Sequence, residues 1–447
     1  MKRLKALISR LREMMGGIHP AKLVFLGYLS YVVVGWVVLC IPFLQRAGGV
    51  KALDALFIAT SAVSTTGLVT VSVSDCYNFG GQLVVLLLIQ MGGVGYMTFG
   101  SFVILSRKTD LPAVRSQIGK TVFSLPASFR IDKFLRSVIQ FTLVIELVGA
   151  VALYLIFRRA GLPDALWSAV FHSVSAFCTA GFGLYNNSFE GFAGNFWLNA
   201  AISVLSYLGA VGFIVCVDVW RVLRGKVKSL TLTSKIILWA TLWLTLGGTV
   251  LLLVAEPSIQ SKPVDQRLLA AFFQAMTSMT TVGFNTVSIA GLSRASLLLL
   301  VLLMVIGASP SGTGGGLKST TFSAIIGVMR SAIRGEQEVK FWGRPVPLER
   351  VWTAVAGLGF YLATLVVGTY LLELTEQSSF VENLFEAASA LGTVGLSMGI
   401  TGSLTNVGKL VVILLMFAGR LGPLTFGMAL FFRRGLNLVG QDDDLAV

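Results

Sequence analysis

The stretch Phe57-Ile58-Ala59-Thr60-Ser61-Ala62-Val63-Ser64-Thr65-Thr66-Gly67-Leu68 occurs in four versions in this sequence. The other three run from Phe171 to Phe182, from Phe273 to Phe284 and from Phe385 to Leu396. All four fit the pattern F-x-[AS]-x-[ST]-[AS]-x-x-T-x-G-[LF] and are spaced almost evenly along the chain. Recurrence at a fixed period indicates an internal repeat, here a fourfold one.

The composition indicates a membrane protein. The chain has 447 residues, of which 55% are hydrophobic and only 13% are charged, whereas a soluble domain has about 25% charged residues. A helix needs about 20 apolar residues to cross the hydrocarbon core of a bilayer. Uncharged runs of this length occupy Leu23–Leu44, Leu83–Ser106, Ile236–Ala255 and Val351–Leu372. We therefore expect an all-α polytopic membrane protein.

The net charge of +14 follows from topology rather than from a nucleic-acid partner. Most of the Lys and Arg residues fall in five stretches, namely before residue 23, within 106–137, 218–236 and 329–351, and after residue 432. Pairs of apolar helices lie between these stretches, and the positive-inside rule places all five in the cytoplasm. We predict a multi-pass protein of the cell membrane with both termini cytoplasmic, in contact with lipid and not with nucleic acid.

Each repeat has the order helix, repeated stretch, helix. A helix over Asp54–Ser64 would rise only about 16 Å, at about 1.5 Å per residue, against a bilayer core of about 30 Å. The stretch must therefore enter the membrane, turn at Thr-x-Gly and leave on the same side. Irregular backbone at that depth is tolerated beside protein or a water-filled cavity. We expect four helix–pore-loop–helix repeats around one central pore, with eight membrane-spanning helices.

The predicted organisation divides the chain into seven parts. Phe196–Val217 and Leu410–Phe432 are read as continuous return crossings. The parts are a cytoplasmic basic tail (1–22), pore repeat 1 (23–106), a cytoplasmic loop (107–136), pore repeat 2 (137–224), pore repeat 3 with an interrupted second helix (232–330), pore repeat 4 (349–433) and a cytoplasmic tail (434–447).

The four turns have the chemistry of a cation filter. Thr-x-Gly contains no acid, base or thiolate, but its backbone carbonyls can replace the water around an ion. Glycine permits positive φ and close approach of two backbones, and the C-terminal end of each preceding helix carries a partial negative charge. Because no ring of Asp or Glu accompanies the turns, we expect a monovalent cation. The predicted filter is Thr65, Thr66, Gly67, Thr179, Ala180, Gly181, Thr281, Val282, Gly283, Thr393, Val394 and Gly395.

The sequence resembles the Trk/Ktr/HKT superfamily of potassium-transport membrane subunits, and within it the Ktr type (KtrB-like). The four repeats cover residues 23–432, and two further segments match, Gly307–Thr320 and Gly419–Thr425. Some plant relatives that favour sodium have Ser at the first filter glycine, whereas this chain has Gly67. The resemblance implies potassium uptake by a homodimer with a separate KtrA-like cytoplasmic ring of nucleotide-binding subunits. It leaves open whether sodium activates transport, and a sodium- or ammonium-permeable relative is the alternative.

The second helix of the third repeat is interrupted by a glycine-rich run. Two apolar halves, Leu297–Ile306 and Thr320–Met329, flank a segment in which glycines and Pro310 disfavour an α-helix. In the resembling family this segment is a gate. Arg420 follows Gly395 by 420 − 395 = 25 residues and Gly307 follows Gly283 by 307 − 283 = 24, so the two are expected at one depth. The predicted gate residues are Gly307, Pro310, Gly312, Gly314, Gly315, Gly316, Lys318 and Arg420.

Three features of the sequence allow other interpretations. Gly312–Ser319 is close to a phosphate-binding loop, but Leu317 stands where its second glycine must be. An intramembrane hydrolase would use Ser309, which needs a base within hydrogen-bond reach, and nothing in the sequence places His172 there. The alternative role of the buried charge of Arg420 is a structural ion pair, for example with Glu146. We therefore expect a transporter that is not an enzyme.

Overall fold

A computed structural model of the chain describes residues 20–46, 48–95, 131–307, 309, 312–336 and 338–431. These residues are mostly helical, with one short hairpin. Residues 1–19 of the predicted basic tail (1–22), the segment 96–130, Pro310 and the predicted C-terminal tail lie outside the described residues.

The first two repeats follow the predicted order. Repeat one contains α2 (Pro20–Leu39), η1 (Pro42–Leu44), α3 (Ala52–Ser64), α4 (Val73–Cys76) and α5 (Phe79–Val94). Repeat two contains α8 (Ile131–Arg159), α9 (Ala165–Phe177), η2 (Glu190–Phe192), α10 (Phe196–Val211) and α11 (Phe213–Leu223).

The last two repeats have the same order, with a hairpin between them. Repeat three contains α12 (Leu232–Ala255), α13 (Pro257–Gln260), α14 (Val264–Thr280), α15 (Arg294–Val305) and α16 (Ser319–Arg334), and the hairpin is β1 (Lys340–Phe341) with β2 (Arg344–Pro345). Repeat four contains α17 (Leu348–Thr375), α18 (Phe380–Gly392), η3 (Thr401–Ser403), α19 (Asn406–Leu421) and α20 (Pro423–Phe431).

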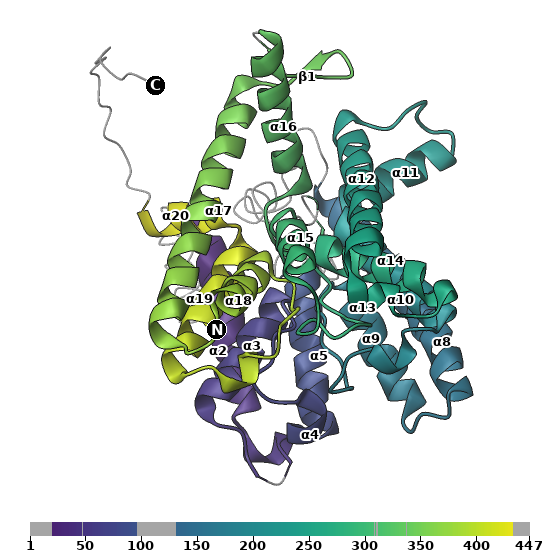
Figure 1. Ribbon diagram of the computed structural model, residues 1–447, viewed down its shortest axis with the longest axis vertical. Helices are drawn as coiled ribbons and strands as arrows, with labels where there is room; N and C mark the ends of the chain where they lie inside the picture. Colours follow the sequence, from purple (N-terminus) through teal and green to yellow (C-terminus); the bar gives the residue numbers. More distant parts are fainter. Residues whose placement is uncertain are drawn as a thin grey trace, which may run out of the picture.

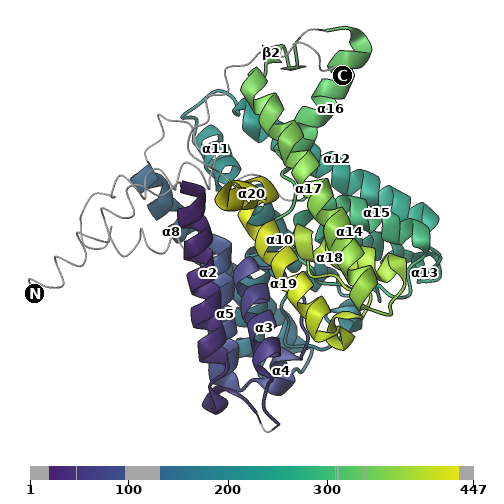
Figure 2. The ribbon, with the colours of Figure 1, turned by 90° about the vertical axis from the view of Figure 1, so that its left-hand side faces the viewer.

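The short helices α3, α9, α14 and α18 carry the four repeated stretches. Each packs against both helices of its own repeat and against the second helix of another repeat. These cross-repeat pairs are α3 with α19, α9 with α5, α14 with α10 and α18 with α15, so the order of the repeats closes on itself. Figures 1 and 2 show the short helices enclosed by the longer ones.

Among the described residues, three helices are long and apolar enough to cross a membrane alone, Arg136–Arg159, Leu232–Ala255 and Leu348–Thr375. Two further pairs qualify as bent spans, α10 with α11 and α19 with α20, and they bend by 102° and 104°. The prediction of eight spanning helices is therefore met in part by length and composition, and the remainder stays a prediction.

The bends correct two predicted crossings. Phe196–Val217 and Leu410–Phe432 are not continuous helices, because the chain breaks at Gly212 (φ 94°) and Gly422 (φ 82°). Helix α5 also ends at a glycine with positive φ, Gly95. An interruption of the second helix is thus not peculiar to the third repeat.

The first predicted crossing is also shorter than expected. Helix α2 ends at Leu39 rather than at Leu44. Pro42 disfavours the helical conformation of the residue before it, and Ile41 is accordingly extended, with ψ 120°. A 3₁₀ turn then covers residues 42–44.

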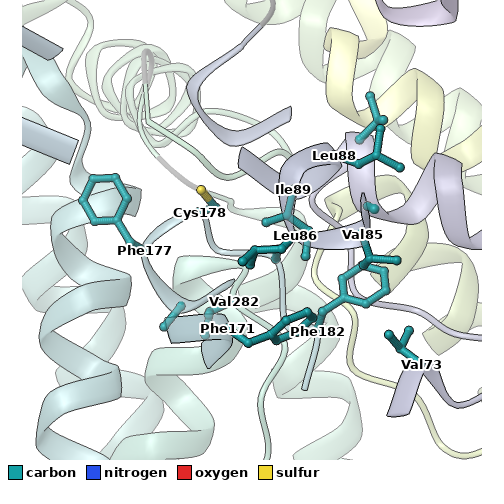
Figure 3. Packing of buried hydrophobic residues seen from close by; sticks show 14 of the residues in the cluster. Val73, Val85, Leu86, Leu88, Ile89, Phe171, Phe177, Cys178, Phe182 and Val282 are labelled. Atoms are coloured by element: carbon teal, nitrogen blue, oxygen red, sulfur yellow. The ribbon is translucent and has the colours of Figure 1, made fainter. Parts of the chain in front are cut away.

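The buried apolar residues form two clusters. One joins mainly repeats one and two, and the other joins mainly repeats three and four. In Figure 3, Val85 and Ile89 of α5 lie beside Phe171 of α9 and Phe182, the residue after the second turn. Packing between repeats therefore fixes the walls from which the turns project.

Helices α16 and α17 extend far beyond the rest of the molecule at one end, where the hairpin joins them (Figure 1). Helix α4 lies at the opposite end (Figures 1 and 2). The two ends of the molecule are therefore built differently, one from short turns and the other from two projecting helices.

Candidate functional site

The four short helices end in the same unusual conformation. Their C-terminal threonines have positive φ angles of 52°, 51°, 58° and 49°, at Thr65, Thr179, Thr281 and Thr393 respectively. Positive φ is uncommon for a β-branched residue, and such strain persists only where the surroundings impose it. The four turns therefore share one enforced geometry.

The four glycines two residues later close into a ring. A Cβ on Gly67 would meet the carbonyl of Ala180, one on Gly181 the carbonyl of Val282, and one on Gly283 the carbonyl of Val394. A Cβ on Gly395 would meet the carbonyl of Thr66, which returns to the first repeat. Each of these glycines also has positive φ. Any side chain at these positions would push apart two neighbouring turns.

A cavity of about 370 Å³ lies on the glycine side of the ring. Its lining includes all four ring glycines and polar residues of the outer loops. One outer contact joins repeats one and two, because Asn186 donates to Asp75 (2.8 Å) and accepts from Ser72 (2.7 Å). Hydrogen bonds from Asn186 and then Ser72 hold the pKa of Asp75 below its ordinary value.

On the threonine side of the ring lies the glycine-rich segment of repeat three. Thr313 is fully buried there. Its carbonyl accepts a hydrogen bond from the hydroxyl of Thr65 (3.3 Å), and its own hydroxyl lies 3.1 Å from that of Thr179. Gly315 lies so close to Thr393 that a Cβ there would overlap the threonine side chain. The segment thus touches the threonines of three repeats.

The segment is fixed from below by helix α10. The amides of Ser309 and Thr313 donate to the carbonyls of Ala210 and Gly209, both at 3.1 Å. Lys318 donates to the carbonyls of Gly314 (2.8 Å) and Gly315 (3.4 Å), and so stabilises the turn of its own segment. This loop has defined partners on both of its faces.

Arg420 joins this loop to repeat one. Its guanidinium donates to the carbonyls of Thr313, Gly92 and Gly93. The alternative partner Glu146 is wrong, because within the described residues the Glu146 carboxylate accepts from Gln90 and Cys178 instead. A planar guanidinium with five N–H donors suits several carbonyls at once.

The candidate hydrolase residues are engaged in structural contacts. The hydroxyl of Ser309 donates to the carbonyls of Ala210 and Val211. His172 uses Nδ1 to donate to the carbonyl of Ser168 (2.7 Å) and Nε2 to accept from the amide of Leu184 (3.2 Å). None of these contacts, which are those between described residues, joins Ser309 to His172.

Sequence reasoning missed several residues of this region. Thr313 is not among the predicted gate residues, yet it contacts two of the four threonines. Gly92 and Gly209 were not singled out, although a Cβ on either would clash with the carbonyl of Val63 or Phe177 at the end of a short helix. Their recurrence after each turn was the available signal.

Comparison with known proteins agrees with this architecture. Residues 41–434 match the family described as TrkH: Cation transport protein. The potassium/sodium uptake protein NtpJ of Enterococcus hirae is 34% identical, over 93% of this chain and 94% of that protein. The Ktr system potassium uptake protein B of Vibrio alginolyticus is 33% identical, over 92% and 90% of the two chains.

The fold has a solved counterpart. The crystal structure of the potassium transporter TrkH from Vibrio parahaemolyticus matches with a TM-score of 0.72 at 21% identity, covering 91% of this chain and 84% of that one. These similarities agree with the expectation of a multi-pass membrane protein that is not an enzyme. The chain belongs to the TrkH/Ktr family of cation transport proteins.

Proposed function

We propose that this chain is the ion-translocating subunit of a Ktr-type potassium uptake system, with the ring of four turns as its selectivity filter. The observation that carries the proposal is the closure of the ring, in which each glycine lies against the carbonyl before the next glycine. Backbone carbonyls that converge from four sides can replace the hydration shell of a monovalent cation. The names of the relatives, which include potassium uptake, support the choice of ion.

Electrostatics in the ring favour a cation. Four helix C-termini, those of α3, α9, α14 and α18, end at the ring, and each carries a partial negative charge. The buried hydroxyls of Thr281 and Thr393 have no hydrogen-bond partner within the described residues. Unpaired buried hydroxyls are costly, so these two are available to an ion or its water.

The loop of repeat three is proposed as the gate. It covers the threonine side of the ring through Thr313 and Gly315, and Arg420 fixes it there through the carbonyl of Thr313. The gate in this proposal comprises Gly307, Gly312, Gly314, Gly315, Gly316, Lys318 and Arg420; Pro310, although predicted, lies outside the described residues.

The uptake would be driven by the membrane potential, which contributes about 2.3 kcal/mol per charge at 100 mV, or roughly fiftyfold accumulation. As a Ktr-type subunit, the chain would form a homodimer, bind a KtrA-like cytoplasmic ring and have both termini in the cytoplasm. Sodium would be its candidate activator. A sodium-permeable transporter is the second candidate, since one relative is named a potassium/sodium uptake protein.

Rubidium uptake into vesicles with an imposed potential tests the filter. Gly67→Ser and Gly283→Ser should each reduce the preference for rubidium over sodium, because the new side chain displaces a neighbouring carbonyl. Gly402→Ser is the matched control, since the nearest atom to a Cβ at Gly402 is 3.7 Å away. Unchanged selectivity in both filter variants would contradict the proposed filter. Equal uptake of sodium and rubidium by the unaltered protein would favour the second candidate.

A further inference from the structure

The second position of the repeated stretch is chemically different in every repeat. It is occupied by Ile58, His172, Gln274 and Glu386, directly after the shared phenylalanine. All four side chains are fully buried. Three polar side chains of different chemistry at one buried, structurally equivalent position need an explanation, because each must find a partner there.

All three polar residues bind the chain that leaves the ring of their own repeat. His172 accepts the amide of Leu184 at 3.2 Å, and Gln274 donates to the carbonyl of Val287 at 3.1 Å. Glu386 accepts the hydroxyls of Ser397 (2.8 Å) and Thr401 (2.5 Å). The side chains differ, but each connects a short helix to its outgoing segment.

The network of repeat four is the most complete. Ser397 also accepts the amide of Gly399 at 3.0 Å, and its hydroxyl oxygen lies 3.0 Å from that of Thr401. One helical turn further along α18, Ser389 accepts the amide of the ring glycine Gly395 at 3.0 Å. Glu386 and Ser389 are three residues apart and so share a helix face. The outgoing segment is therefore fixed at its first residue and again beyond it.

Repeat one lacks a polar residue at this position, since Ile58 cannot form such a bond. Its outgoing segment is held at Gly67, whose amide donates to the hydroxyl of Ser61 at 3.1 Å, and further out through the contact of Ser72 and Asp75 with Asn186 of repeat two. The outgoing segment of repeat one therefore depends on contacts at other positions.

We propose that the second position of the repeated stretches in repeats two, three and four is a positioning site that sets the orientation of the filter carbonyls, and that Glu386 sets ion preference in repeat four. The inference rests on the proposed filter. Without the hydrogen bond from this position, a turn can rotate its carbonyls toward a smaller ion, because fewer contacts then fix its outgoing segment. Glu386 is a positioning residue, since it lies behind the ring and touches the outgoing segment rather than the ion path.

Two variants remove hydrogen bonds between Glu386 and the outgoing segment with little change of side-chain volume, and these are called the brace variants below. Glu386→Gln replaces one acceptor oxygen by a donor NH₂, so one of the two hydroxyls loses its acceptor. Thr401→Val removes one donor and keeps the shape. Each should reduce the rubidium-over-sodium preference by about tenfold, the effect of one hydrogen bond to a charged group. The double variant should be little worse than either single one, because both break the same contact.

Ile58→Val is the matched control, since it alters the same position in the repeat that has no such contact. The readouts are the ratio of rubidium to sodium uptake and the amount of folded, monodisperse protein. An unchanged ratio in Glu386→Gln and Thr401→Val, with or without loss of protein, would show that the contact only supports the fold. Gly395→Ser distinguishes the proposed filter from the proposed role of Glu386. If Gly395→Ser changes the ratio and the brace variants do not, the filter proposal is supported and the positioning role of Glu386 is wrong.

Discussion

Removal of the Arg420 side chain should release the loop that covers the ring. In the structure this side chain joins two parts of the molecule, the loop through the carbonyl of Thr313 and helix α5 through the carbonyls of Gly92 and Gly93. Arg420→Ala removes the connection and also removes a positive charge next to the ion path. Both changes favour conduction.

The size of the effect follows from the contact to the loop. Of the three hydrogen bonds of Arg420, the one to Thr313 holds the loop, because the other two anchor the guanidinium to repeat one. A hydrogen bond to a charged group contributes about 1.5–3 kcal/mol, and each 1.4 kcal/mol is tenfold in an equilibrium constant. The ratio of closed to open protein should therefore fall by roughly 10- to 150-fold.

Rubidium flux into proteoliposomes that contain only this chain measures the change. Arg420→Ala should increase the flux, and Arg420→Lys should have a smaller effect, because an ammonium can still reach one carbonyl as a point donor. Lys318→Met is the comparison, since the described partners of Lys318 are carbonyls of its own loop and its loss should matter less. Arg158→Ala, at an exposed helix end, controls for loss of charge alone.

Deletion of residues 312–316 should also increase the flux, and the deletion combined with Arg420→Ala should be less than additive, because both act on one closed state. The opposite result is decisive. If Arg420→Ala abolishes flux in folded, monodisperse protein, the side chain supports the pore itself and its assignment to the gate is wrong.

Two further predictions concern topology and stability. Cysteines introduced at Ser229 and Ala332, both exposed, should resist an impermeant thiol reagent in intact cells, whereas one at Ser403 should react. The background lacks Cys40 and Cys76. Labelling of the first two cysteines from outside would contradict the predicted topology. Lys409→Met should cost about 3–5 kcal/mol, seen as a lower melting temperature in detergent, because it leaves buried Asp54 without its partner at 2.7 Å; if Asp54→Asn in the same chain restores nothing, the ion pair is not the cause.

The repeats could be read from the sequence because their signal is local and occurs four times. The expected helix over Asp54–Ser64 agrees with α3, which spans Ala52–Ser64. The turn at Thr-x-Gly follows from the residue types alone, since glycine tolerates positive φ. The same reasoning placed Arg420 and the loop at one depth, and the structure joins them through Thr313.

The breaks at Gly212 and Gly422 could not be read in the same way. A single glycine within an apolar run is tolerated in a helix at a cost of about 1 kcal/mol, so the sequence does not distinguish a packed helical glycine from a break. Gly209 and Gly419 remain helical, and there the missing Cβ makes room for a neighbouring carbonyl. Gly212 and Gly422 instead have positive φ. Tertiary packing, which the sequence does not show, separates the two cases.

The hydrogen-bond partners of Arg420 could not be predicted from the sequence, for a related reason. A carboxylate is the expected neighbour of a buried cation by charge, and Glu146 was available in the sequence. Backbone carbonyls are present everywhere, so no pattern in the sequence marks the ones that converge on a guanidinium. Only the closed arrangement of the repeats brings Thr313 and Gly92 to the same side chain.

A single chain with four repeats permits an asymmetry that four identical subunits cannot have. The ring itself is equivalent in all repeats, because backbone conformation alone defines it. The side chains behind the ring differ, as Ile58, His172, Gln274 and Glu386 show, and within the described residues the covering loop comes from repeat three. One loop can therefore act on the whole ring by touching the threonines of three other repeats. If the proposed filter and gate are correct, selectivity depends on shared backbone geometry and gating on contacts that occur once, so substitutions should separate the two properties.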